Sequence, residues 1–325
     1  MGAAIAAGIG LAPLAAGCSR GDSDAPKIST PYLWGLHVDE SRLFGNLHAA
    51  EHQLNRRADV VLIFRSIAHQ PTDVLAKLQD AGYEVALTLE FWDGSGTDWR
   101  PWTLRSIANG DHDAALKAWL TAIAALPRPV HLRPLHEFNG NWYPWCVYTP
   151  GNDLSSFHAA WRHVAAMSRS IARDKARLQL CFNRQNGYEG DHELPGKASD
   201  FYPGDDVVDE LVINGYNRPG KRTSKPFADI FGGYYAQLRA LRPHLPLWIG
   251  EIASTEQFGD KPDWIRDAFR QVLTRYPVAC LTWFDETVAV HGEPLRDWKF
   301  DTTPTSLQAM REAVGWTRPP TGGSS

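Results

Sequence analysis

Eight short runs of β-branched and aromatic residues alternate with amphipathic segments along most of this chain, and no low-complexity linker separates them. Repeated strand and helix units of this kind build a parallel sheet. Eight such units fit a closed (β/α)8 barrel, the TIM barrel of the α/β class, as a single domain over residues 32–316. A doubly wound sheet is the alternative, but it would require a glycine-rich phosphate turn, which the sequence lacks.

The element boundaries follow from these patterns. The expected strands are 32–38, 59–64, 84–90, 130–135, 177–182, 210–214, 247–250 and 278–284. The expected helices are 41–58, 72–81, 113–126, 154–173, 227–241, 263–275 and 305–314. The connections after strands four, five, six and eight are long and rich in Trp, Tyr, Asn and Gly. Because barrel enzymes carry their active sites at the carboxyl ends of the strands, we expect the functional site among these connections.

Charge and aromatic content restrict the ligand class. The chain has 33 basic and 37 acidic side chains with no long run of either sign, so nucleic acid is not an expected partner. It also has 13 tryptophans. Flat aromatic faces suit sugar rings and other partly apolar ligands.

Both ends of the chain lack the alternating pattern. Residues 1–17 are small and apolar, and Cys18 opens a polar stretch over 18–31 that reads as a flexible tether. The sequence Leu-Ala-Ala-Gly-Cys ending at Cys18 resembles a bacterial lipobox, which predicts a signal peptide, lipidation of Cys18 and an exported lipoprotein anchored in the cell envelope. A soluble protein with an apolar terminus is the alternative. The tail 317–325 is expected to be disordered.

The other cysteines do not suggest a structural framework. Cys146, Cys181 and Cys280 have no CxxC spacing, which argues against a zinc site and a disulfide scaffold. Whether two of them pair stays open. We expect no metal and no cofactor, and a monomer.

Two glutamates occupy the positions at which a barrel places catalytic groups. Glu137 follows the fourth strand and Glu251 the seventh. Side chains alternate along a strand, so every second one would point toward the barrel axis. In the fourth strand and its end these would be Arg133, Leu135 and Glu137, and in the seventh they would be Leu247, Ile249 and Glu251. Two carboxyl groups converging on an aromatic cleft suit glycosidic bond cleavage. The alternative for each glutamate is a capping or ion-pairing role.

Four motifs of the chain resemble one known family. The segment HLRPLHEFNGNWYPW (131–145) is similar to the strand-four motif of glycoside hydrolase family 26. LVINGYN (211–217), PLWIGEIAS (246–254) and LTWFDE with LRDWKFDTTPTSLQAM (281–310) resemble the motifs of strands six, seven and eight. The resemblance covers about residues 32–314. Members of the family are retaining β-mannanases, β-1,3-xylanases and mixed-linkage β-glucanases.

The resemblance implies roles for five residues. Glu137 matches the acid/base and Glu251 the nucleophile. Tyr216 matches the tyrosine that donates a hydrogen bond to the nucleophile, which would hold that carboxylate ionised. Trp142 matches an aromatic beside the cleaved bond, and Trp283 the aromatic floor under the sugar.

Further residues are candidates for substrate contacts, each with a structural alternative. His136 resembles a family histidine near the substrate but would also fit a buried structural position. Arg133 is either a substrate contact or a partner that keeps the carboxylates ionised. The remaining candidates are Asn139, Trp145, Glu90, Trp92, Asp285 and Glu286.

These observations favour a retaining endo-β-glycanase that acts on a polysaccharide or oligosaccharide. The default substrate is β-1,4-mannan. A xylan, a β-glucan or a bacterial exopolysaccharide is the alternative. The charged loop 182–206 would suit an acidic or branched exopolysaccharide. A non-catalytic glycan-binding lipoprotein is the alternative from another class of protein.

Overall fold

The structure is a computed structural model that describes residues 32–94, 98–218, 223–289 and 295–316. The predicted signal peptide 1–17, the predicted tether 18–31 with Cys18 and the tail 317–325 lie outside the described residues. Within the described ranges, no helix combines the length and the apolar character needed to cross a membrane.

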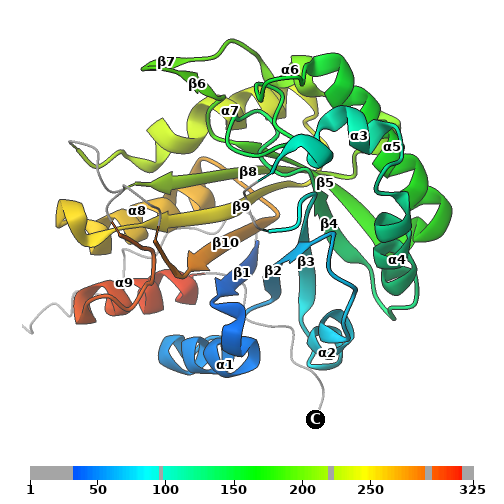
Figure 1. Cartoon of the computed structure of the whole chain (residues 1–325). Helices are drawn as coiled ribbons and strands as arrows, with labels where there is room; N and C mark the ends of the chain where they lie inside the picture. The colour runs from blue at the N-terminus through cyan, green and yellow to red at the C-terminus, as the bar shows by residue number, and fades with distance from the viewer. Residues whose placement is uncertain (1–31, 95–97, 219–222, 290–294, 317–325) are drawn as a thin grey trace, which may run out of the picture.

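Eight parallel strands close into a barrel, as predicted, with each strand beside its sequence neighbour in the βα repeat (Figure 1). The barrel strands are β1 (Leu33–Val38), β2 (Val60–Ser66), β3 (Glu84–Glu90), β4 (Val130–Pro134), β5 (Ala176–Asn183), β8 (Glu210–Asn217), β9 (Leu247–Ser254) and β10 (Cys280–Asp285). Parallel pairing of β1 with β10 closes the sheet. The carboxyl ends of all eight strands therefore meet at one end of the barrel.

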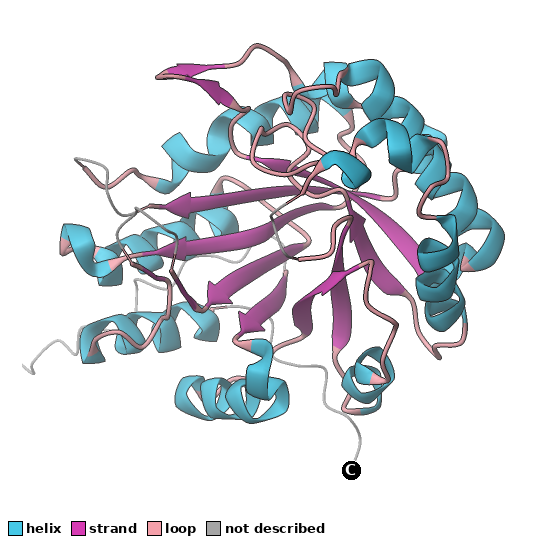
Figure 2. Cartoon of the chain, in the orientation of Figure 1, coloured by secondary structure: helices cyan, strands magenta, loops and turns pink. Residues whose placement is uncertain are grey.

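Helices surround the barrel on its outer side (Figure 2). They are α1 (Leu43–Leu54), α2 (Val74–Asp80), α3 (Leu104–Ala108), α4 (Asp113–Ala124), α5 (Leu154–Ile171), α6 (Ala198–Phe201), α7 (Phe227–Leu241), α8 (Lys261–Thr274) and α9 (Pro304–Gly315). The sequence did not predict the short α3 and α6, which are too brief to show a helical period. A capping box between Asp153 and Ser156 begins α5, the longest of the described helices.

Two small hairpins extend the connections at the carboxyl end of the barrel. β6 (Tyr188–Glu189) pairs with β7 (His192–Glu193) after β5, and β11 (Thr287–Val288) pairs with β12 (Arg296–Asp297) after β10. The first hairpin projects beyond the barrel at the top of Figure 1. Both hairpins carry residues that line the cavities described below.

The barrel interior has its own apolar layer, separate from the layer under the helices. Its buried residues are Val60, Leu62, Ala86, Cys181, Val212, Trp248 and Cys280. Leu135, Leu247 and Ile249 were expected to face the axis, but they belong to the larger cluster that contains the buried helix faces. The predicted direction of these three side chains was wrong because the backbone departs from regular alternation before Glu137 and before Glu251. Cys146, Cys181 and Cys280 are buried and unpaired.

Candidate active site

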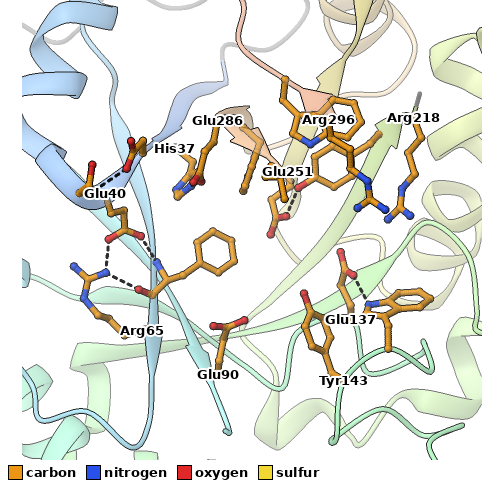
Figure 3. A pocket seen from close by; sticks show the side chains of 18 of the residues that line it. His37, Glu40, Arg65, Glu90, Glu137, Tyr143, Arg218, Glu251, Glu286 and Arg296 are labelled. Atoms are coloured by element: carbon orange, nitrogen blue, oxygen red, sulfur yellow. Dashed lines mark hydrogen bonds and ion pairs between the residues drawn. The ribbon is translucent and has the colours of Figure 1, made fainter. Parts of the chain in front are cut away.

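A cleft of about 940 Å³ opens at the carboxyl end of the barrel (Figure 3). This volume lies within the range of small-ligand sites. Predicted site residues that line it are Glu90, Trp92, Glu137, Trp142, Tyr216, Glu251 and Glu286. It is also lined by His37, Asp39, Glu40, Ser41, Phe64, Arg65, Tyr143, Arg218, Phe284, Val288, Arg296 and Trp298.

Glu137 reaches the cleft through a strained turn and not through strand alternation. Strand β4 ends at Pro134, and both Leu135 (φ 51°) and Glu137 (φ 55°) adopt left-handed backbone conformations. Such conformations cost about 1–3 kcal/mol each and persist where the surroundings impose them. Here the Glu137 N–H donates to the Cys181 carbonyl oxygen at 2.8 Å. Hydrogen bonding to β5 thus fixes the carboxylate at the cleft.

A bulge in β9 performs the same task for Glu251. The pairing of β8 with β9 shifts so that Ile213 faces Ile249 while the next residue, Asn214, already faces Glu251. Gly250 is the extra residue, and a Cβ there would lie 2.3 Å from a Val212 methyl carbon. Such a contact is not tolerable, so the bulge depends on glycine. The shift directs the Glu251 side chain into the barrel.

The side-chain amide of Asn214 joins the two carboxylates. Its Nδ2 donates to Glu137 Oε1 at 3.1 Å and to Glu251 Oε1 at 2.7 Å. The sum of these two distances is an upper limit for the separation of the two oxygens. It falls short of the spacing of about 6.5 Å at which inverting glycosidases begin, whereas retaining enzymes hold their carboxyl groups about 5–5.5 Å apart.

Glu251 has two further partners that favour its charged form. Arg133 Nη1 lies 3.3 Å from Glu251 Oε1, and the Tyr216 hydroxyl donates to Glu251 Oε2. Burial, together with the facing carboxylate of Glu137, nevertheless raises the pKa of Glu251 to about 7. Tyr216 therefore makes the predicted contact, but it does not keep the pKa of Glu251 low on its own. The two carboxylates share one low-dielectric site, which favours binding of a proton near neutral pH.

Glu137 has a different set of partners. The Trp142 indole N–H donates to Glu137 Oε2 at 2.8 Å, and the indole itself lines the cleft. A Cβ at Gly140 would lie 2.6 Å from two carbons of this ring, so Trp142 needs a glycine beneath it. Each oxygen of Glu137 thus accepts one neutral hydrogen bond, and no cation contacts it among the described residues.

Glu90 and Trp92 lie in the cleft as predicted and contact each other. The Trp92 indole donates to Glu90 Oε2 at 3.3 Å. Burial raises the pKa of Glu90 to about 7. A carboxyl group with this pKa can donate as well as accept a hydrogen bond, which suits contact with sugar hydroxyls.

Some predicted contacts lie behind the cleft wall. Trp283 is fully buried and its indole donates to the Trp298 carbonyl oxygen, so Trp283 does not form the floor of the cleft. Phe284 and Trp298 line the cleft instead. Asp285 is also buried and accepts a hydrogen bond from the Phe300 N–H.

The polar loop after β4 supports the cleft from behind. Asn139 is buried and bonds to the backbone of Asn183 through both its amide nitrogen and its oxygen. Trp145 is buried and stacks on Tyr143, with ring centroids 4.7 Å apart. Tyr143 itself lines the cleft, so Trp145 supports the lining.

His136 and Arg133 take the structural alternative that the sequence left open. His136 is buried among aromatic rings, and burial next to Arg133 lowers its pKa to about 3, so its imidazole is neutral. Arg133 is fully buried and contacts Gln179 as well as Glu251. Neither side chain lines the cleft.

Sequence reasoning missed the opposite wall of the cleft, which β1 and β2 supply. His37 Nδ1 lies 3.0 Å from the Leu62 carbonyl and its Nε2 lies 2.9 Å from Glu286 Oε2. Although burial opposes protonation, these partners and Glu40 raise the pKa of His37. Arg65 forms an ion pair with Glu40. The position of these residues at strand ends was the available signal.

No metal site is evident in the parts of the chain that the structure describes. No group of three or more His, Cys, Asp or Glu side chains there is arranged to hold an ion.

Comparison with known proteins gives one family. A sequence model described as "Glycosyl hydrolase family 26" matches residues 107–244. A protein named "Endoglucanase H" from Acetivibrio thermocellus is 32% identical over 226 residues, which are 67% of this chain and 24% of that protein. The chain therefore spans about a quarter of the length of this relative.

Solved structures share the fold at low sequence identity. The catalytic domain of a GH26 endo-β-1,4-mannanase from Bacillus sp. JAMB-750 superposes with a TM-score of 0.66 at 16% identity, covering 90% of this chain and 88% of that domain. The GH26 domain of an endo-β-mannanase/endo-β-glucanase from Prevotella bryantii gives a TM-score of 0.62 at 12% identity, with 88% and 89% covered.

The contacts of Glu251 predict how its titration responds to loss of one donor. In Tyr216→Phe the carboxylate loses a hydrogen bond that stabilises its charged form, so the pKa of Glu251 should rise above its value of about 7. Carbon-13 NMR of glutamate-labelled protein measures this midpoint. Tyr143→Phe, in the same cleft, is the control and should move it less. An unchanged or lower midpoint in Tyr216→Phe would contradict the assigned hydrogen bond.

Proposed function

Because this chain belongs to glycoside hydrolase family 26, we propose that it is a retaining endo-β-glycanase with Glu137 as acid/base and Glu251 as nucleophile. The observation that carries this proposal is the pair of carboxylates joined by the Asn214 amide in an aromatic cleft. The spacing leaves room for a sugar carbon between them, but not for the additional water of an inverting reaction.

In the first step, Glu251 attacks the anomeric carbon while Glu137 gives its proton to the departing glycosidic oxygen. The carbon–oxygen bond to the leaving sugar breaks as the ester bond to Glu251 forms. Arg133 and Tyr216 aim the attacking carboxylate and favour its ionised form. Neutral hydrogen bonds from Trp142 and Asn214 hold the two oxygens of Glu137 in the cleft.

In the second step, water enters where the leaving sugar departed. Glu137, now a carboxylate, accepts a proton from this water while the water oxygen attacks the anomeric carbon. The bond to Glu251 breaks and the nucleophile recovers its charge. Two displacements at one carbon retain the β configuration, and both carboxyl groups return to their starting protonation states.

The proposed substrate is a β-linked polysaccharide, and β-1,4-mannan is the first to test. Structural relatives named as β-mannanases support this choice, although their identity of 12–16% speaks for the fold alone. A β-glucan is the second candidate, because the 32% identical relative is named an endoglucanase. Trp92, Trp142, Tyr216 and Trp298 supply aromatic faces for sugar rings in either case.

We also propose that the protein is an envelope lipoprotein held to a membrane through Cys18. The support is the apolar segment 1–17 and the residues that precede Cys18. A polar tether at 18–31 would place the barrel away from the membrane surface. This arrangement would bring the enzyme close to polysaccharide in the envelope or in transit across it.

The division of labour between the glutamates gives a direct test. An activated 2-fluoro glycoside of the substrate sugar should label Glu251, because fluorine slows release of the glycosyl-enzyme. Glu251→Ala should lose turnover on every substrate. Glu137→Ala should lose polymer hydrolysis by roughly 10²–10⁴-fold, yet react with an aryl glycoside whose leaving group needs no proton.

Peptide mapping of the labelled enzyme and a product screen on mannan, xylan and mixed-linkage glucan check these outcomes. A label on Glu137, Glu90 or Glu286 would show that the roles are wrongly assigned. Binding without cleavage on every polymer would favour a glycan-binding protein instead.

The lipid anchor has an independent test. The wild-type chain should partition into detergent and carry a diacylglycerol mass on Cys18, whereas Cys18→Ala should stay in the aqueous phase. Mass spectrometry of the mature amino terminus is the measurement. A wild-type protein that retains Met1 and does not partition would contradict the anchor and leave the enzymology untouched.

A further inference from the structure

A second cavity of about 430 Å³ adjoins the cleft beside Trp142. Trp142, Tyr216 and Arg218 line both cavities, so the two cavities are adjacent at these residues. The second cavity is also lined by Asn141, Arg184, Gln185, Tyr188, Gly190, Asp191, Asn217, Thr223 and Lys225. Three of its residues are cationic and one is acidic.

The two arginines are brought together by neighbouring strands. Arg184 directly follows β5 and Arg218 directly follows β8, and these strands pair in register at Asn183 and Asn214. The Arg184 N–H donates to the Asn214 carbonyl oxygen at 2.8 Å, which fixes the backbone at this point. Asn214 is also the residue that joins the two carboxylates, so the arginines lie beside the reaction centre.

The positive charge of this cavity is not balanced by described carboxylates. Neither Arg184 nor Arg218 forms an ion pair within the part of the chain that the structure describes. Glu193, whose charge acts on Arg184 without an ion pair, accepts a hydrogen bond from the Asn186 N–H. Burial and repulsion by Arg218 lower the pKa of Arg184. Holding two guanidinium groups together in this way is unfavourable until an anion joins them.

The other end of the cleft contrasts with this arrangement. There Arg65 pairs with Glu40, and His37 pairs with Glu286. Figure 3 shows these pairs on one side of the cleft and Arg218 on the other, which is the side of Glu137. Arg218, which forms no ion pair with the described residues, thus lies away from these two pairs and beside the second cavity.

From this geometry we infer that the second cavity binds an anionic group carried by the glycan substrate, a carboxylate or a sulfate ester, next to the bond that is cleaved. Guanidinium groups bind both anions through paired hydrogen bonds. Trp142, Tyr188 and Tyr216 would pack against the sugar that bears the group. The inference rests on the proposed glycanase function and narrows its substrate to an acidic β-glycan.

Binding measured without turnover tests the inference. The probes are β-1,4-mannan and β-glucan oligosaccharides in three forms: unmodified, partly oxidised at C6 to carboxylates, and partly sulfated. Isothermal titration calorimetry with Glu251→Gln reports affinity while hydrolysis is blocked. At least one anionic form should bind about tenfold more tightly than its neutral parent, and the preference should weaken with salt.

Substitutions then locate the anion. Arg218→Gln and Arg184→Gln, each in the Glu251→Gln background, should remove most of this preference, whereas Arg218→Lys should keep part of it. Arg162→Gln is the matched control: Arg162 forms a half-exposed ion pair with Asp206 and lines neither cavity, so the preference should persist. Thermal unfolding identifies any variant that has lost its fold. If Arg184→Gln does not fold, the result for Arg218→Gln decides.

The outcomes separate this inference from the proposed function. Equal binding of neutral and anionic probes, or a preference that survives both glutamine substitutions, would overturn the inference. Hydrolysis of the neutral polymers by the wild-type enzyme is measured separately. Its absence on every polymer would refute the proposed glycanase, while an arginine-dependent preference in binding would still support the anion site. Preference for the oxidised or for the sulfated probe identifies the anion.

Discussion

Two buried carboxylates held close to one another define the energetics of this active site. Their repulsion in a low-dielectric interior must be offset by fixed donors, and the Asn214 amide hydrogen-bonds to both of them. The rest of the site follows from that requirement. Arg133 and Tyr216 add donors on the Glu251 side, and Trp142 adds one on the Glu137 side. The two carboxyl groups thus share one interior but have different neighbours.

The backbone irregularities serve the same arrangement. Regular strands would end before Glu137 and would direct Glu251 out of the barrel, since Leu247 and Ile249 belong to the outer layer. A left-handed turn at Glu137 and a glycine-dependent bulge before Glu251 direct both glutamate side chains into the cleft. Strain and a bulge at functional residues are expected where geometry is imposed by the surrounding fold. The barrel provides the rigid frame, and these two irregularities in its strands position the two carboxyl groups.

Periodicity in the sequence predicted the eight strands and the order of the helices, because each strand is bounded by turn residues and each long helix has a buried face. It also led to Glu137 and Glu251, because catalytic groups of a barrel lie at strand ends. Alternation failed for Leu135, Leu247 and Ile249, since neither the bulge nor the positive φ values are visible in a hydrophobic pattern. The family resemblance placed Trp283 at the floor of the cleft, whereas Trp283 is buried and Phe284 lines the cleft. Pairings such as His37 with Glu286 join distant segments and have no local signature.

The cleft therefore combines a reaction centre set by two carboxylates with a cationic side that we assign to an acidic sugar. We assign double displacement to these two carboxylates. Proton NMR of the anomeric signals during hydrolysis of a β-linked oligosaccharide shows which anomer of the product is released. The β anomer should form first, and the α anomer should appear later by mutarotation. Initial release of the α anomer would show inversion and contradict the assignment of Glu251 as nucleophile.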